Sequence, residues 1–423
     1  MARRVIFHVD ANSAFLSWSA AYRVMVLGEK EDLRDVPSVV AGDKENRHGI
    51  ILAKSTPAKK YGIHTGEPLF QALEKCPQLR VVAPDYELYV EVSRHFVALL
   101  REFSPVVEQY SIDEAWVDMS GTELLYGSPM NAAHLLRQRV WEELGFTVNV
   151  GVSSNKLLAK MAGDFSKPNQ VHSCFPDEIG EKLWPLPVRE LFMVGPATER
   201  KLRRLGILTI GQLAQTELPT LTRLLGKQGQ TIWNFANGRN TDSVLTMPED
   251  NKGYGNSVTT AADVTTRQEA YSVLLSLCET VGMRMRRDGK SGSCVTVHLR
   301  NKQFENYSHQ KRMHNITDRT TAIFEAAREV FDEMWDGQDP LRQLGVQVTR
   351  LCDEGYCQYD FFTAAQPQTQ EKILRLDATV DGLRDKYGEG IVRRGRFLRG
   401  GDHMAGGLSK VRRTGITKPV AEK

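Results

Sequence analysis

Apolar and polar positions along residues 5–152 follow an order that predicts one split βαβ unit. Short apolar runs predict strands, and apolar residues that recur every three or four positions predict helices. This order of elements is that of the ferredoxin-like fold. The expected elements are a strand at 5–10, a helix at 88–103, strands at 106–112 and 115–119, a helix at 132–144 and a strand at 147–152.

Three acids fall at the ends of these predicted strands. Asp10 closes the first strand, and Asp113 and Glu114 stand in the turn before the third. In the ferredoxin-like order the end of the first strand lies beside the start of the third, so Asp10 is expected to face the other two. A single acid in such a place is most often a turn former. Three converging carboxylates instead need cations to offset their repulsion.

The type of ligand indicates which cation such a cluster would hold. Oxygen ligands without nearby Cys or His favour Mg²⁺ or Mn²⁺. Two such ions about 4 Å apart would activate one phosphate oxygen and stabilise the leaving one. The three acids therefore predict a two-metal site for phosphate chemistry.

The insertion between residues 14 and 83 is too long for a simple connection from strand to helix. Glycines and prolines punctuate it throughout, so we expect a small subdomain beside the acidic cluster. Its basic stretch consists of Lys54, Lys59 and Lys60. These lysines either reach a triphosphate or are ordinary surface residues, and the sequence favours neither alternative.

Residues 186–214 carry the pattern of a helix-hairpin-helix. Val194-Gly195-Pro196 and Leu205-Gly206-Ile207 stand at matching spacing among short helical segments. Glycines let the backbone approach a phosphate closely, and N–H groups at a helix start bind phosphate oxygens. An ordinary pair of packed helices is the alternative.

A second split βαβ pattern follows a polar segment at 241–252 that lacks periodicity and is typical of a linker. Its expected elements are a strand near 256–260, a helix at 267–287, strands at 294–301 and 307–313, a helix at 318–335 and a strand at 344–350. Beyond residue 362, Ile373, Leu376, Val380 and Leu383 predict one more helix. The Gly-rich, basic stretch from 393 to 423 is expected to be disordered.

Length and composition limit the class of protein. A chain of 423 residues has room for roughly three domains. The net charge is only +3, but segments 189–239 and 284–312 carry an excess of basic residues. Such an excess suggests contact with a polyanion, although solvated helix faces would explain it too. The six cysteines are scattered and form no CxxC pair, which predicts reduced thiols. No signal peptide or membrane span is evident in the sequence, so we expect a soluble, cytoplasmic protein.

Three motifs together resemble the Y-family, translesion DNA polymerases, with an order of parts similar to the bacterial DNA polymerase IV and UmuC-like branch. The resemblance covers residues 3–351, and it is carried by His8-Val9-Asp10-Ala11-Asn12-Ser13-Ala14-Phe15, by Tyr110-Ser111-Ile112-Asp113-Glu114-Ala115, and by Gly151-Val152-Ser153-Ser154-Asn155-Lys156-Leu157-Leu158-Ala159-Lys160 with Ser166-Lys167-Pro168.

The resemblance implies an α+β right hand with a ferredoxin-like palm, small fingers, a helix-hairpin-helix thumb and a βαββαβ little finger. It implies a palm at 1–13 and 84–175, fingers at 14–83, a thumb at 176–239, a linker at 240–253, a little finger at 254–351 and a C-terminal tail at 352–423. The implied substrates are primer-template DNA and a dNTP, bound by a monomer.

Residue by residue, the resemblance also implies roles. Asp10, Asp113 and Glu114, with the Ala11 carbonyl, would hold two Mg²⁺ ions, with Mn²⁺ as an alternative metal. Phe15 would be the steric gate against a ribose 2′-hydroxyl, and alternatively a core residue. The remaining implied contacts are Thr56, Lys59 and Lys167 to the triphosphate and Gly195, Gly206, Arg300 and Lys302 to DNA.

Two departures from the family pattern affect these expectations. Thr56 and Lys59 stand where the family usually has Tyr and Arg, and a lysine lacks the bidentate fork of Arg. Asn12 stands where a second acid is frequent. Both departures leave the three metal-binding acids in place.

The segment Gln358-Tyr359-Asp360-Phe361-Phe362 resembles the short peptides that bind a sliding clamp, because Gln358, Phe361 and Phe362 could anchor an extended segment in an apolar groove. A final strand of the little finger is the alternative. For the whole chain, the expected function is template-directed, low-fidelity DNA synthesis. The alternatives are a palm-fold nucleotide cyclase and a non-catalytic DNA-binding scaffold.

Overall fold

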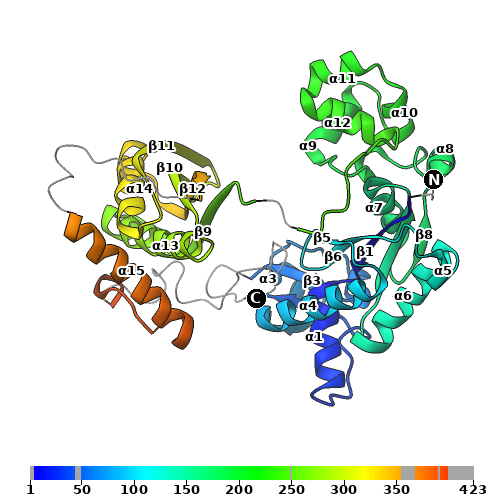
Figure 1. Cartoon of the computed structure of the whole chain (residues 1–423), viewed down its shortest axis with the longest axis horizontal. Coiled ribbons are helices and arrows are strands. Elements are labelled where there is room, and N and C mark those ends of the chain that lie inside the picture. The colour runs from blue at the N-terminus through cyan, green and yellow to red at the C-terminus, as the bar shows by residue number, and fades with distance from the viewer. Residues whose placement is uncertain (1–3, 43–48, 248–249, 354–366, 389–390, 399–423) are drawn as a thin grey trace. The chain divides into compact units, whose positions relative to one another are not determined.

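The computed structural model describes residues 4–42, 49–247, 250–353, 367–388 and 391–398 (Figure 1). These residues divide near residue 248 into two compact units, and each unit is described by itself. Both units combine helices with sheets, so the expected α+β class is confirmed.

The first unit is built on a five-stranded sheet with the order β5-β6-β1-β7-β8. Its central strand, β1 (Ile6–Ala11), runs antiparallel to β6 (Glu114–Asp118) and to β7 (Val148–Ser153). The edge strands are β5 (Val107–Gln109) and β8 (Val171–Ser173). The predicted order of strands and helices is confirmed, and β5 is shorter than expected.

Helices cover the two faces of this sheet differently. The helices α4 (Tyr86–Phe103) and α6 (Pro129–Leu144) share one apolar core with residues such as Phe7 and Val9 of β1. Each fully buried Phe or Leu in that core stabilises the fold by about 1.5–3 kcal/mol. On the other face, α7 (Lys156–Asp164) packs against β1 and β7. The short α5 (Glu123–Tyr126) precedes α6.

The predicted subdomain at 14–83 has a three-stranded sheet with the order β3-β2-β4 and a core of its own. The sequence pattern missed its first helix, because Ser17 and Ser19 interrupt the apolar stripe of α1 and are both buried with it. Its elements are α1 (Ala14–Met25), β2 (Ser38–Ala41), β3 (Ile51–Lys54), α2 (Thr56–Lys59), α3 (Leu69–Lys75) and β4 (Arg80–Val82).

Short helices follow from residue 176 to residue 236 around a third core. The segment before Gly195 forms only the single 3₁₀ turn η2, so the first helix of the predicted helix-hairpin-helix is one turn long. The elements are η1 (Pro176–Glu178), α8 (Ile179–Lys182), η2 (Val188–Glu190), α9 (Pro196–Arg204), α10 (Ile210–Gln215), α11 (Leu218–Leu225) and α12 (Lys227–Ala236).

The second unit repeats the split βαβ order around a four-stranded sheet, β11-β10-β12-β9. Its apolar core joins the sheet to two helices, and the helix at 267–287 is confirmed to the residue. The elements are β9 (Gly253–Val264), α13 (Arg267–Arg287), β10 (Ser291–Asn301), β11 (Asn306–Thr317), α14 (Thr320–Met334) and β12 (Leu341–Cys352).

The predicted C-terminal helix exists as α15 (Pro367–Tyr387), but two residues of its predicted apolar stripe are exposed. Leu376 and Leu383 are 60% and 40% exposed. Asp381 instead pairs with Arg286 of α13 at 2.6 Å, and Arg384 pairs with Glu279 at 3.3 Å. The helix is therefore held on α13 by charged residues.

The expected disorder from residue 393 is wrong for its first residues. Arg394 donates to Glu279 at 2.5 Å, and 395–398 form the 3₁₀ turn η3 (Gly395–Leu398). The rest of that stretch, from 399, lies outside the described residues, as does the segment 358–362. Among the described residues, no helix is both long and apolar enough to cross a membrane.

Candidate active site

The strand register brings the three predicted acids together. Asp10 of β1 lies directly opposite Glu114, the first residue of β6. Asp113 joins them because the Ala11 N–H donates to the Asp113 carbonyl at 3.0 Å. The expectation that these acids face one another across adjacent strands is confirmed.

A hollow of about 380 Å³ opens in front of Asp10 and Asp113. Residues of the insertion form its other wall, so segments far apart in the sequence enclose it. The residues that line it are Asp10, Ala11, Ser13, Ala14, Phe15, Leu52, Ala53, Lys54, Lys59, Thr65, Asp113 and Lys167. Five predicted site residues besides Asp10 lie here: Ala11, Phe15, Lys59, Asp113 and Lys167.

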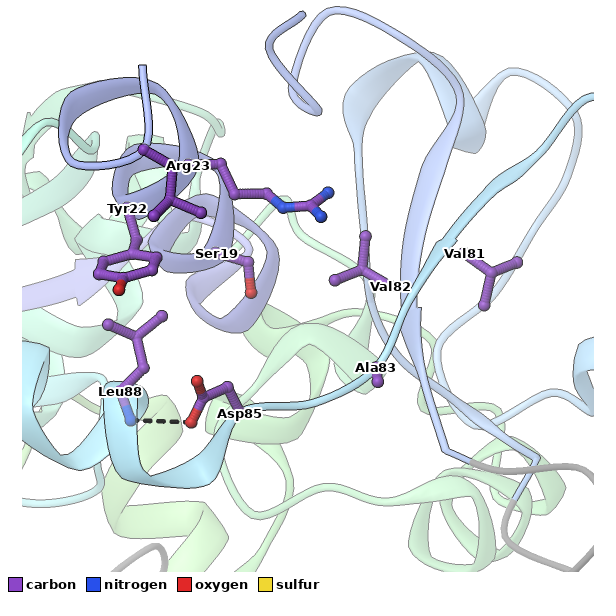
Figure 2. A pocket seen from close by; sticks show the side chains of 9 residues that line it. Ser19, Tyr22, Arg23, Val81, Val82, Ala83, Asp85 and Leu88 are labelled. Carbon is purple, nitrogen blue, oxygen red and sulfur yellow. Dashed lines mark hydrogen bonds between the residues drawn. The ribbon is translucent and has the colours of Figure 1, made fainter. Parts of the chain in front are cut away.

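A second hollow, of about 360 Å³, lies where α1 meets the chain between β4 and α4 (Figure 2). Asp85 is its only acid, and this carboxylate accepts a hydrogen bond from the Leu88 N–H at 3.1 Å as the cap of α4. This second hollow therefore lacks the converging charges of the first.

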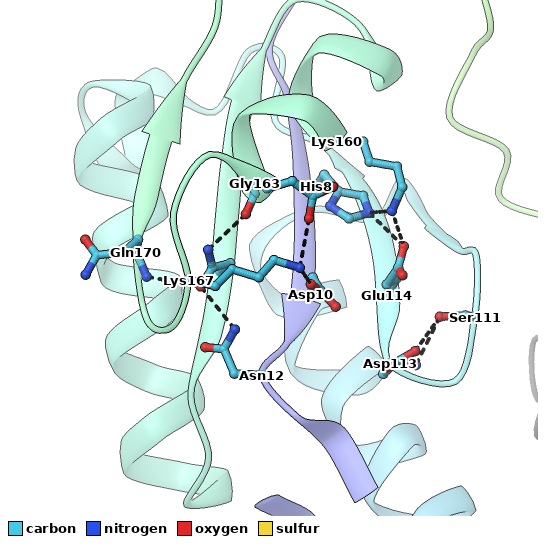
Figure 3. A network of polar contacts seen from close by, with 12 residues as sticks. His8, Asp10, Asn12, Ser111, Asp113, Glu114, Lys160, Gly163, Lys167 and Gln170 are labelled. Atoms are coloured by element: carbon cyan, nitrogen blue, oxygen red, sulfur yellow. Dashed lines mark hydrogen bonds and ion pairs between the residues drawn. The ribbon is translucent and has the colours of Figure 1, made fainter. Parts of the chain in front are cut away.

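Lysines pair with two of the three acids (Figure 3). Lys167 contacts Asp10 and also Asp164, the latter at 2.8 Å. Burial alone would lower the pKa of Lys167, but the charge of Asp10 outweighs it and raises this pKa. Burial raises the pKa of Asp10 even against the charge of Lys167.

Glu114 has two partners on the same carboxylate oxygen. Lys160 Nζ lies 2.6 Å from Oε2, and His8 Nε2 lies 3.1 Å from it. Burial would raise the pKa of Glu114, but the His8 hydrogen bond and the Lys160 charge lower it to about 2. Burial lowers the pKa of His8, which favours the neutral imidazole at pH 7. Glu114 is thus fixed as an anion.

Asp113 interacts with a hydroxyl instead. Ser111 Oγ donates to Asp113 Oδ1 at 2.6 Å, and burial raises the pKa of this carboxyl. In the described part of the chain, no three His, Cys, Asp or Glu side chains are grouped as a ready-made metal cluster. Oxygen donors of Asp10, Asp113 and Glu114 nevertheless suit a hard divalent cation.

One glycine allows α7 to place its lysines over the sheet. A Cβ at Gly151 of β7 would lie 1.9 Å from the Ala159 carbonyl oxygen and 2.4 Å from the Gly163 nitrogen. Only glycine fits there, and α7 therefore lies against the strand. One turn before Lys160, Lys156 pairs with Glu108 at 2.6 Å and lies over the Trp116 ring at 4.3 Å.

Asn12 has a structural role that sequence reasoning missed. Its Oδ1 accepts from the Asn169 N–H at 2.8 Å, and its Nδ2 donates to Asn149 Oδ1 at 3.1 Å. Asn149 in turn donates to the carbonyls of Gly163 and Ser166 at 2.9 and 2.6 Å. These amides tie the loop that carries Lys167 to the end of β1. The first motif contains Asn12, but Asn149 and Asn169 lie outside the motifs, and the pairing of the three depends on the fold.

Phe15 of α1 lines the hollow and is fixed by other aromatic rings. Its ring stacks on Tyr89 with centroids 4.4 Å apart and planes within 6°. Tyr89 is fully buried, and its hydroxyl lies 2.9 Å from Ser19 Oγ. Phe15 thus packs on the core and also lines the hollow, and its role as a steric gate stays a prediction.

The other predicted contacts fall in different places. Thr56, the first residue of α2, is not among the residues that line the hollow, whereas Lys54 and the unpredicted Thr65 are. Gly195 is the N-cap of α9, and Gly206 follows that helix with φ of +77°. Arg300 and Lys302 belong to the second unit, where Arg300 donates to Asn306 at 2.8 Å and Lys302 is exposed.

Comparisons with known proteins agree with this architecture. Family models match residues 9–164 (impB/mucB/samB family), 251–361 (the C-terminal domain of that family) and 189–240 (DNA polymerase-iota, thumb domain). DNA polymerase IV of Clostridium acetobutylicum is 42% identical over 93% of this chain and 98% of that protein. DNA polymerase IV 2 of Bacillus subtilis is 34% identical over 94% and 95%.

A solved Y-family DNA polymerase chimera has the same fold. It covers 83% of this chain and 100% of its own with a TM-score of 0.70, at 22% sequence identity. Because the family models match most of the residues and the relatives match nearly the whole length, the chain belongs to the impB/mucB/samB family of Y-family DNA polymerases.

Proposed function

We propose that this DNA-directed DNA polymerase extends a primer by two-metal nucleotidyl transfer in the hollow in front of Asp10 and Asp113, and that it acts in translesion synthesis. One observation carries the proposal. Paired carboxylates form one wall of that hollow, and the lysines Lys54, Lys59 and Lys167 line it together with an aromatic ring. Such an arrangement suits a metal-bound triphosphate attached to a sugar.

Asp10, Asp113 and Glu114 would hold two Mg²⁺ ions, or Mn²⁺, with the Ala11 carbonyl as a further oxygen ligand. When bound, these ions activate the primer 3′-hydroxyl and stabilise the leaving pyrophosphate. The chain itself supplies the orientation of the carboxylates. Asp10 and Glu114 are fixed by strand pairing, and Asp113 is held by Ser111.

Cationic side chains would bind the triphosphate. Lys59 and Lys167 line the hollow, and Lys54 adds a third charge beside Lys59. The start of α1, at Ser13 and Ala14, also lines it, and a helix N-terminus favours an anion. Thr56, which is outside the lining, is a weaker candidate contact.

Phe15 would exclude ribonucleotides because its stacked ring has little freedom to withdraw from the sugar. Beyond the hollow, the glycine-containing turns at Gly195 and Gly206 would contact DNA phosphates, and Arg300 and Lys302 would do so from the second unit. Such contacts bind without sequence preference and weaken with salt.

The proposed division of the chain is a palm, fingers, thumb, linker and little finger at the boundaries expected from the sequence. The proposed setting is a cytoplasmic monomer that binds a sliding clamp through Gln358, Phe361 and Phe362. These clamp residues lie outside the described part of the chain.

Primer extension on an undamaged template with Mg²⁺ and four dNTPs tests the proposal. The wild type should extend the primer, and the double variant Asp113→Ala/Glu114→Ala should not. Glu123→Ala, which changes an exposed acid of α5, is the matched control and should extend normally. DNA binding without extension by the wild type would favour a scaffold, and nucleotide turnover without primer-template would favour a cyclase.

A further inference from the structure

Glu114 differs from the other two acids because two different kinds of donor meet on one of its oxygens. Lys160 brings a full positive charge to Oε2 at 2.6 Å, and the neutral His8 reaches the same atom at 3.1 Å. Figure 3 shows both side chains pointing toward Glu114, His8 from β1 and Lys160 from α7.

The tautomer of His8 follows from its neighbours. Glu114 is ionised and can only accept a hydrogen bond, so a lone pair on His8 Nε2 would repel it at 3.1 Å. Nε2 therefore carries the proton and donates it to Glu114. Lys160 Nζ lies 3.5 Å from the same ring nitrogen. The two nitrogens come this close because both donate to Glu114 Oε2.

These two donors affect a divalent cation differently. An ammonium group repels a cation that approaches the oxygen it holds. A neutral N–H donor fixes the carboxylate and adds no charge, as the groups around metal ligands commonly do. Lys160 is also restrained: its side chain is 12% exposed, and its Nζ lies 5.8 and 5.5 Å from the ring centroids of Tyr110 and Phe192.

We propose that Lys160 competes with a divalent metal ion for the Glu114 carboxylate, while His8 is a positioning residue that keeps the carboxylate oriented for the metal. Metal binding then requires Glu114 to exchange the ammonium for the ion, and Lys160 sets how tightly the protein binds metal before DNA and nucleotide arrive. The proposal rests on the proposed two-metal function and assigns residues outside the expected ligand set.

The test is Mn²⁺ binding to the full-length protein without DNA or nucleotide, measured by calorimetry and by the electron paramagnetic resonance of free Mn²⁺. Lys160→Met should bind Mn²⁺ about tenfold more tightly than the wild type, the effect of removing one charge-assisted contact. His8→Phe should bind Mn²⁺ more weakly, and His8→Gln, which restores an N–H donor, should recover much of the loss.

Lys156→Met is the matched control because it removes the same charge one turn away on α7, where the partner is Glu108. It should leave the Mn²⁺ affinity close to that of the wild type. Equal tightening in Lys156→Met and Lys160→Met, or weaker binding in Lys160→Met, would overturn the competition. Equal affinity of His8→Phe and the wild type would overturn the role of His8.

The experiments distinguish a failure of this proposal from a failure of the proposed function. A wild type that neither extends a primer nor binds Mn²⁺ refutes the two-metal site itself. A wild type that does both, with unchanged binding in the Lys160 and His8 variants, refutes only the present proposal. Thermal unfolding of each variant identifies misfolding of the buried His8 substitution, and Lys160→Met, at a half-buried position, then decides the competition independently.

Discussion

Gly151→Ala tests whether the close packing of α7 on β7 positions the active-site lysines. The added methyl group would start 1.9 Å from the Ala159 carbonyl oxygen, whereas real contacts of this kind are essentially never below 3.0 Å. The helix would therefore have to withdraw by about 1 Å, because both sides of the contact are backbone. Overpacking of this kind costs about 1–3 kcal/mol of folding free energy.

The same withdrawal would disturb catalysis. Lys160 is adjacent to Ala159, so such a shift would lengthen its 2.6 Å contact with Glu114. Lys167 follows shortly after the end of α7 and would move with it. A displacement of about 1 Å at a reacting centre can reduce the rate by about 100-fold. We expect a loss of that order in kcat/KM.

The assay is single-nucleotide incorporation below the unfolding temperature of every variant, together with urea unfolding. Gly180→Ala is the matched control, since its methyl group would meet only Trp184 at 4.0 Å. It should retain wild-type kinetics and stability. Wild-type kcat/KM and stability in Gly151→Ala would refute the positioning role of this packing.

Three further expectations concern the gate, the acids and the clamp. Phe15→Ala should admit ribonucleotides while retaining dNTP incorporation, and unchanged discrimination between the two would exclude the gate. Asp113→Asn should abolish extension, yet it should raise the melting temperature measured without metal at neutral pH. Burial raises the pKa of Asp113, so the ionised carboxylate destabilises the fold at any pH above that pKa. The neutral Asn side chain removes this cost. Deleting 358–362 should abolish stimulation by a sliding clamp and spare basal synthesis; equal stimulation of the truncated protein would exclude the motif.

Local patterning alone determined the order of the main elements. Apolar runs and helical stripes located the ferredoxin-like unit and the helix at 267–287, because a strand or helix must present its apolar residues with its own period. The same pattern placed the Asp10, Asp113 and Glu114 carboxylates at strand ends. Topology then required Asp10 and Glu114 to be neighbours, as their register confirms.

The hydrophobic pattern gave a wrong prediction where polar groups decide how a helix packs. The apolar stripe predicted for the last helix included Leu376 and Leu383, yet these face solvent. Asp381 and Arg384 make the contact with α13 instead. Hydrophobic periodicity carries no information about ion pairs between segments about 100 residues apart. The buried serines of α1 obscured that helix for a related reason, since buried hydroxyls interrupt an apolar stripe.

The fine structure of the site was decided only by the tertiary fold. Lys160 reaches the Glu114 oxygen that His8 also contacts because Gly151 lets α7 approach the sheet. The Lys167 loop is held by Asn12, which contacts Asn169 across 157 residues of sequence, and by Asn149, which contacts Ser166 across 17. The sequence supplied the residue types, and the three-dimensional packing set the distances on which their charges and hydrogen bonds depend.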